Sequence, residues 1–133
     1  MENRQKVILV VDDEPHIIEL VELYLAKEDF RVVSALDGDS AVEVFRAEEP
    51  DLVVPDMLLP GRDGLDVLGE IRNDRRVHVI MLTASESQAN RVVGLELDAV
   101  DHLTKPFNPG ELVARVKAAL RSPRVAPGEM GVT

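Results

Sequence analysis

The sequence predicts an α/β protein built on one parallel five-stranded sheet. Short apolar runs of strand length alternate with amphipathic stretches of helical period, and polar residues follow four of these runs where the strands would end. Such alternation is typical of βαβ units, whose right-handed crossovers cover the sheet with helices. The 133 residues, 45% of them apolar, suffice for one domain with one core. An aromatic content of 3% makes that core mainly aliphatic.

Five segments are expected to form the strands, at 7–11, 30–34, 52–56, 77–82 and 100–104. The first is apolar throughout and β-branched except for Leu9, as in a strand that is buried on both faces. In parallel sheets of this kind, ligands bind beyond the carboxyl ends of the strands. A functional site is therefore expected at that edge.

Five helices are expected between and after these strands. Pro15 and Pro109 suit the first turns of the first and last helices, Pro50 ends the second, and Ser40 is the expected N-cap of the second. The positions expected to face the core are Ile17, Val21, Tyr24 and Leu25, then Ala41, Val44 and Phe45, then Leu65, Leu68 and Ile71, then Ala89, Val93 and Leu97, and finally Leu112, Val116 and Ala119 or Leu120.

Composition limits the classes of function. A formal net charge of −10 argues against nucleic-acid binding by this chain alone. The sequence has no cysteine, hence no disulfide or thiolate metal site. It has neither a signal-peptide pattern nor an apolar run of the roughly 18 residues needed to cross a bilayer. We therefore expect a cytoplasmic protein with no membrane contact, made of a domain at 1–121 and a Pro- and Gly-containing linker or flexible tail at 122–133.

Three carboxylates, a hydroxyl and an ammonium group follow the predicted strands, in the residues Asp12, Asp13, Asp56, Thr83 and Lys105. Carboxylates about 5 Å apart repel by roughly 3 kcal/mol per pair at an effective dielectric constant of about 20. The cluster therefore needs cations, of which Lys105 supplies one charge. Mg²⁺, which favours few carboxylates together with waters and a substrate phosphate, would supply two.

Asp56 stands alone after Val53-Val54-Pro55 and is the expected nucleophile, because a carboxylate can attack phosphorus to form an acyl phosphate. Lys105 and the metal would hold the phosphoryl oxygens, and Thr83 could donate a hydrogen bond to one of them. Taken singly, each residue could be a helix cap, a turn residue or a solvated side chain. Their joint appearance at strand ends favours the functional interpretation.

Together these residues resemble the receiver (CheY-like) domain of two-component response regulators over about residues 5–121. The motifs that carry the resemblance lie at 10–14, 51–61, 82–84 and 104–107. It implies a flavodoxin-like (βα)5 three-layer sandwich with strand order 2-1-3-4-5. It also implies that Asp56 accepts a phosphoryl group from a sensor histidine kinase.

The same resemblance assigns the other site residues. Asp13, Asp56 and the Met57 backbone carbonyl would bind Mg²⁺, and Asp12 would act directly or through water. Lys105 would pair with the phosphoryl group. Thr83 would move toward that group, and His102, at the position of a switching aromatic residue, would turn inward.

A finer resemblance to the OmpR/PhoB-type subfamily rests on residues 91–97 and 111–116. It implies homodimerisation on phosphorylation through the fourth helix, fifth strand and fifth helix. The candidates for intersubunit ion pairs are Arg91, Glu96, Asp101, Glu111, Arg115 and Lys117, and a solvated charged face is the alternative. The DNA-binding effector domain through which the subfamily regulates transcription is absent from this sequence, so the chain is expected to be either a truncation or a stand-alone receiver.

Two residues depart from the family pattern. Pro55 stands where an aliphatic residue is usual before the phosphoacceptor, and because proline cannot donate to a strand ladder, we expect slower phosphorylation. His102 is expected to make activation or dimerisation vary between about pH 6 and 8, where histidine changes its charge.

Other functions fit the sequence less well. A phosphohydrolase of this chemistry would carry Asp-x-Asp after the first strand, and an FMN module would carry a Ser/Thr/Gly-rich loop there. A pseudo-receiver that acts only as an adaptor stays open because of Pro55. A phosphorylation switch that turns over no external substrate, rather than an enzyme, is the expected function.

Overall fold

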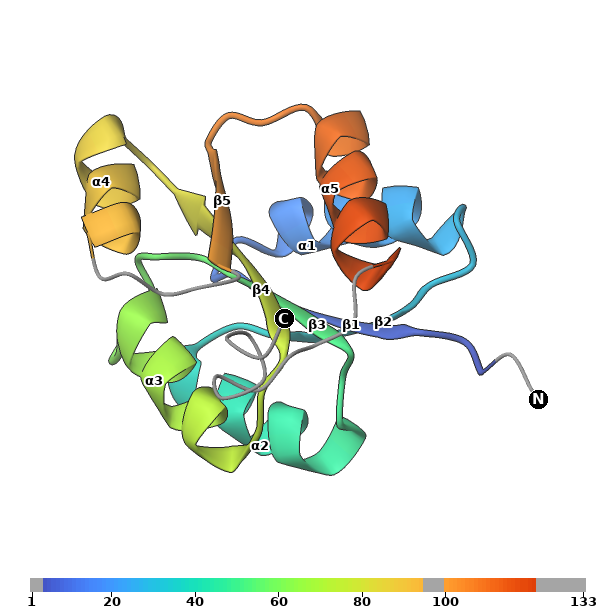
Figure 1. The fold of residues 1–133 in the computed structure, drawn as a ribbon, viewed down its shortest axis with the longest axis horizontal. Helices are drawn as coiled ribbons and strands as arrows, with labels where there is room; N and C mark the ends of the chain where they lie inside the picture. The colour runs from blue at the N-terminus through green and yellow to red at the C-terminus, as the bar shows by residue number, and fades with distance from the viewer. Residues whose placement is uncertain (1–3, 95–99, 122–133) are drawn as a thin grey trace, which may run out of the picture.

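The computed structural model describes residues 4–94 and 100–121 (Figure 1). The strands are β1 Val7–Val11, β2 Arg31–Ala35, β3 Leu52–Pro55, β4 His78–Thr83 and β5 Val100–Thr104. The helices are α1 Pro15–Ala26, α2 Gly38–Glu48, α3 Gly64–Asp74, α4 Glu86–Gly94 and α5 Pro109–Arg121. All strand pairs are parallel and the order is β2-β1-β3-β4-β5. The predicted flavodoxin-like sandwich is therefore confirmed.

The core consists of two clusters, one on each face of the sheet. Successive side chains of a strand point to opposite faces, so Leu9 and Val11 pack with α2, α3 and α4, whereas Ile8 and Val10 pack with α1 and α5. Figure 1 shows α1 and α5 together on one side of the sheet and α2 and α3 on the other. Both clusters are mainly aliphatic, and Phe45 is the largest fully buried side chain. This aliphatic core was expected from the low aromatic content.

The start of α2 differs from the prediction. Its N-cap is Asp37, whose side chain accepts a hydrogen bond from the Ser40 amide at 2.8 Å, so Ser40 lies in the first turn instead. The bond to this backbone amide lowers the pKa of Asp37. Asp63 caps α3 in the same way through the Asp66 amide at 2.9 Å.

Three strands also differ from the prediction by one residue at one or both ends. β2 begins after Phe30, whose amide still bonds to the Leu25 carbonyl in the turn after α1. β3 ends at Pro55, and Asp56 makes an isolated bridge to Leu82. β4 begins at His78 and ends at Thr83.

Most core-facing positions of the helices were predicted correctly. Val21, Leu25, Ala41, Phe45, Leu68, Ile71, Leu112 and Val116 are buried. Leu97, predicted in the fourth helix, and the predicted tail 122–133 lie outside the described residues. Within residues 4–94 and 100–121, no helix has the length and apolar character that a membrane span requires.

Candidate functional site

The predicted site residues lie at one edge of the sheet because each follows, or ends, a parallel strand. Backbone hydrogen bonds continue the ladders one residue past the strands and fix these positions. The Asp56 amide donates to the Val11 carbonyl of β1 at 2.9 Å, and the Lys105 amide donates to the Thr83 carbonyl of β4 at 2.7 Å. The site is thus held by the rigid sheet rather than by a long loop.

The three aspartates form a compact cluster at this edge. One carboxylate oxygen from each of Asp12, Asp13 and Asp56 lies within 4.8 Å of the others. Asp12 is 0% exposed and Asp56 is 7% exposed, whereas Asp13 faces solvent. The cluster therefore has two buried members and one that is open to incoming ions.

Lys105 joins the two buried aspartates. Its Nζ lies 2.8 Å from Asp12 Oδ2 and 2.9 Å from Asp56 Oδ2, and Glu14 Oε1 lies further away at 3.9 Å. Burial by itself would lower the pKa of Lys105, but the hydrogen bonds to Asp12 and Asp56 and the attraction of both carboxylates outweigh it, so the pKa is raised. Lys105 is therefore a persistent cation. Its peptide bond to Pro106 is cis.

Both oxygens of Asp56 have directional partners. Oδ2 accepts the bond from Lys105, and Oδ1 accepts a bond from the Leu58 amide at 3.2 Å. Burial raises the pKa of Asp56 and outweighs the opposite effect of Lys105 and of this amide. Asp56 is thus a poorly hydrated carboxylate in a fixed orientation, as a nucleophile requires.

Thr83 is fully buried and turns toward β5. Its Oγ1 donates to the Leu103 carbonyl at 3.4 Å and shares a hydrogen bond with Thr104 Oγ1 at 3.2 Å. The hydroxyl therefore lies at the predicted edge but is bonded to the neighbouring strand.

The Met57 carbonyl, predicted as a metal ligand, accepts a hydrogen bond from the Gly64 amide at 2.7 Å. One of its two lone pairs is therefore already in use. Gly64 is a further residue that shapes the site, because a Cβ atom there would collide with the Asp56 carbonyl oxygen and with the Met81 sulfur. The Asp63-Gly64 pair, a typical loop signal, is what marks this position in the sequence.

The donor set fits a hard divalent cation. Asp12, Asp13 and Asp56 supply oxygen ligands, which Mg²⁺ prefers, and the exposure of Asp13 lets solvent waters and a phosphate complete the coordination. These three carboxylates carry three negative charges against the single positive charge of Lys105, which leaves two uncompensated. A divalent ion would balance them.

Pro55 interrupts the pairing of β3 with β4. The ladder pairs Leu52 with His78 and Val53 with Val79, and it resumes only at the bridge between Asp56 and Leu82. The Asp56 amide faces β1 and the Met57 amide faces β4, so position 55, two residues before Met57, also faces β4. Because proline has no N–H, it cannot donate to the Ile80 carbonyl there.

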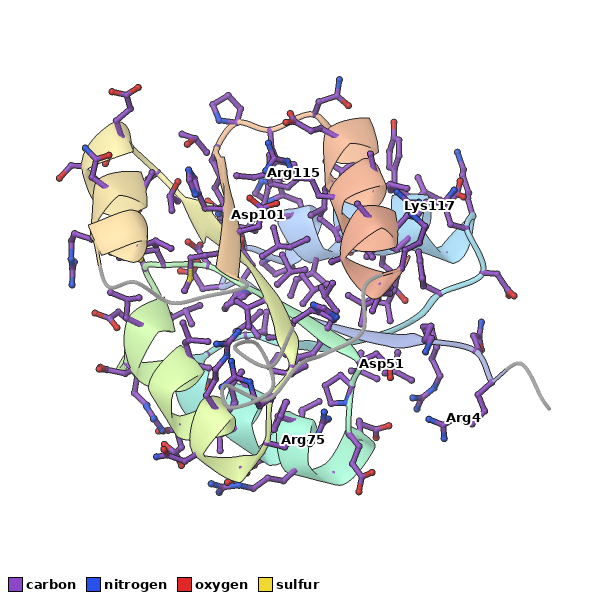
Figure 2. All side chains as sticks on the ribbon, viewed as in Figure 1. Arg4, Asp51, Arg75, Asp101, Arg115 and Lys117 are labelled. Atoms are coloured by element: carbon purple, nitrogen blue, oxygen red, sulfur yellow. The ribbon has the colours of Figure 1, made fainter. Side chains whose placement is uncertain are left out.

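The candidate interface residues separate into two groups. Arg115 donates to Asp101 at 2.7 Å, to Glu111 at 3.0 Å and to the carbonyl of the half-buried His102 at 3.3 Å, so these residues lie together within one chain. Lys117 instead pairs with Glu28 at the other side of α5, at 2.8 Å. Figure 2 shows Arg115 on the side of α5 that faces β5 and Lys117 on the opposite side.

The structure describes one of the two remaining candidates. Arg91 is exposed on α4, and Glu96 lies outside the described residues.

Comparisons with known proteins agree with this geometry. A model of the family described as response regulator receiver domain matches residues 8–117. The BeF₃-activated N-terminal receiver domain of RstA from Klebsiella pneumoniae is 37% identical, with a TM-score of 0.79 over 88% of this chain and 100% of that chain. The BeF₃-activated receiver domain of DrrB is 34% identical, with a TM-score of 0.75 over 90% and 100%. The receiver domain of the Francisella response regulator 1452 is 30% identical, with a TM-score of 0.80 over 88% and 98%.

Proposed function

Because this chain belongs to the response regulator receiver domains of two-component systems, we propose that it acts as a phosphorylation switch whose phosphoacceptor is Asp56. Receiver domains are phosphorylated on an aspartate, generally by histidine kinases, and bind Mg²⁺ in an acidic pocket. The observation that supports Asp56 most strongly is its environment. It is a buried carboxylate between the Lys105 ammonium and the Leu58 amide, inside a cluster of three aspartates.

In the proposed transfer, a carboxylate oxygen of Asp56 forms a bond to the phosphorus of a phosphohistidine on a sensor kinase. The bond from phosphorus to the imidazole nitrogen breaks at the same time, and the imidazole leaves with the electron pair and takes up a proton from solvent. Lys105 neutralises charge on the transferred oxygens. The protein provides position and charge, and the donor provides the reactive bond.

Mg²⁺, when bound, would stabilise the negative charge of the phosphoryl group in the transition state. We assign its binding to Asp13 and Asp56, with Asp12 acting directly or through a water molecule. The Met57 carbonyl stays a prediction, and its hydrogen bond to Gly64 weighs against it.

The response to phosphorylation is proposed to be that of the OmpR/PhoB-type subfamily, in which receiver domains dimerise. Thr83 would leave its partners on β5 for the phosphoryl group, His102 would turn inward, and the face formed by α4, β5 and α5 would then dimerise. The likeness to the RstA and DrrB receiver domains supports this assignment. DNA binding and control of transcription would belong to an effector domain, and a stand-alone receiver or adaptor in the cytoplasm is the alternative.

Incubation with acetyl phosphate and Mg²⁺, followed by intact mass measurement, tests the proposal. The wild type should gain one phosphoryl group, while Asp56→Ala and a wild-type sample with EDTA should gain none. Sustained release of phosphate from generic phosphomonoesters would indicate an enzyme instead. A wild type that stays unmodified would contradict the proposed switch.

A further inference from the structure

The loop between β3 and α3 carries an arginine that binds two helices at once. The Arg62 side chain is 25% exposed, and its guanidinium donates to Asp39 of α2 at 3.2 Å and to Glu70 of α3. An arginine with two carboxylate partners on different elements resists rotation more than one with a single surface partner. Arg62 therefore ties the loop to α2 and α3.

The stem of Arg62 also packs against the start of α2. A Cβ atom added at Gly38 would lie 3.0 Å from Arg62 Cβ and 3.0 Å from Val67 Cγ2. Glycine at position 38 thus allows α2 to approach the loop closely. The arginine is held by packing as well as by charge.

The same loop orients the phosphoacceptor. The Leu58 amide binds Asp56 Oδ1, and the Gly64 amide closes the loop onto the Met57 carbonyl. In the sequence, Arg62 lies between Leu58 and Gly64, whose amides donate these two hydrogen bonds. A shift of the loop at Arg62 would thus reach the amide that holds the Asp56 carboxylate.

We propose that Arg62 is a positioning residue for phosphoryl transfer, because it fixes the loop 57–64 and thereby the Leu58 amide that orients Asp56. This inference rests on the proposed phosphorylation of Asp56. Arg62 lies 6 positions after Asp56 in the sequence, and its guanidinium contacts the helices α2 and α3 rather than the acidic cluster.

The chain offers a matched control. Arg46 of α2 also binds two carboxylates, the same Glu70 at 3.2 Å and Asp74 at 2.7 Å. Its side chain is 53% exposed, and its described ion pairs all lie between α2 and α3. Arg46→Gln therefore removes two ion pairs between α2 and α3, including one to the Glu70 carboxylate that Arg62 also binds, while Arg62 keeps both of its own partners.

The test compares the wild type, Arg62→Gln, Arg62→Lys and Arg46→Gln. Rates of phosphorylation by acetyl phosphate at saturating Mg²⁺ are measured by intact mass, and thermal melting measures stability. Hydrogen exchange of peptides that cover residues 56–64 measures the loop directly. We expect Arg62→Gln to be phosphorylated about threefold to tenfold more slowly, since a misplacement of about 1 Å can cost about 10²-fold. Arg46→Gln should retain the wild-type rate, and Arg62→Lys should recover part of it.

The hydrogen-exchange measurement distinguishes a failure of the proposed positioning role of Arg62 from a failure of the proposed phosphorylation of Asp56. Faster exchange of the loop in Arg62→Gln only, together with the slower phosphorylation, supports the positioning role. Equal rates or equal loop exchange in Arg62→Gln and Arg46→Gln would overturn it even when the wild type is phosphorylated. A wild type that accepts no phosphoryl group would overturn the proposed function, whatever the exchange of the loop.

Discussion

The Lys105 ammonium donates a hydrogen bond to Asp56 Oδ2 at 2.9 Å. The lysine therefore binds the carboxylate to which we assign phosphoryl transfer. The same ammonium binds the fully buried Asp12 at 2.8 Å. Before any metal arrives, Lys105 is thus the cation in contact with both buried acids.

Lys105→Met should lower the melting temperature of the metal-free protein. Two buried carboxylates would lose their cation, and breaking a buried ion pair costs about 3–5 kcal/mol, an upper bound here because Lys105 is partly exposed. Added Mg²⁺ should recover part of the loss. Thermal melts in EDTA and in Mg²⁺ measure both effects, with Lys105→Arg as the control that keeps the charge. A Met variant as stable as the wild type in EDTA would contradict the prediction.

Asp56→Asn should stabilise the metal-free protein at neutral pH. Burial raises the pKa of Asp56 in the folded state, so its ionised form lowers the free energy of unfolding above that pKa. This loss of stability in the wild type diminishes as the pH falls through the raised pKa. The stability difference between Asp56→Asn and the wild type should therefore vanish near the ordinary aspartate pKa of about 3.9.

Melting curves of the wild type and Asp56→Asn from neutral to acidic pH in EDTA measure whether the variant is the more stable protein and how the difference changes with pH. Asp13→Asn, at the exposed aspartate, should change stability less. A variant at position 56 that is less stable than the wild type at neutral pH would refute the argument.

Pro55→Leu should be phosphorylated faster than the wild type. Leucine supplies the N–H that position 55 directs at β4, so the ladder between Val53 and Asp56 becomes continuous. One hydrogen bond contributes about 1 kcal/mol, which limits the gain to about fivefold. Rates with acetyl phosphate measure it, and Pro55→Ala separates the amide from the leucine side chain. Equal rates in all three proteins would show that the missing amide is without consequence.

Arg115→Ala should weaken dimerisation of the phosphorylated protein, whereas Lys117→Ala should leave it unchanged. Arg115 organises the charged groups of β5 and α5, but Lys117 pairs with Glu28 toward α1. Sedimentation with acetyl phosphate and Mg²⁺ measures the dimer. The reverse order of effects would place the interface on the α1 side of α5.

The sequence predicts the fold and the meeting of the acids well because both follow from strand order. Asp56 and Lys105 are 49 residues apart, yet both come directly after parallel strands, so they share an edge. The N-cap of α2 was harder, since Asp37 and Ser40 both have capping side chains and only local geometry chooses between them.

Tertiary contacts explain what the sequence leaves open. The partners of Arg62 and Lys117 depend on how helices pack, and nothing in the spacing of the chain specifies Asp39 or Glu28 for them. The bond between Gly64 and the Met57 carbonyl depends on the path of a tight loop, which periodicity does not describe.

The orientation of Thr83 has a consequence for how a signal would leave the site. Its bonds to Leu103 and Thr104, at 3.4 and 3.2 Å, are long and neutral, and they add to the backbone pairing between the inner strand β4 and the edge strand β5. A charged phosphoryl oxygen is the stronger acceptor, at about 1.5–3 kcal/mol against about 1 kcal/mol. Under the proposed function, phosphorylation would remove these two side-chain bonds while the backbone pairing of β4 with β5 stays in place, so the change would reach β5 at Leu103 and Thr104.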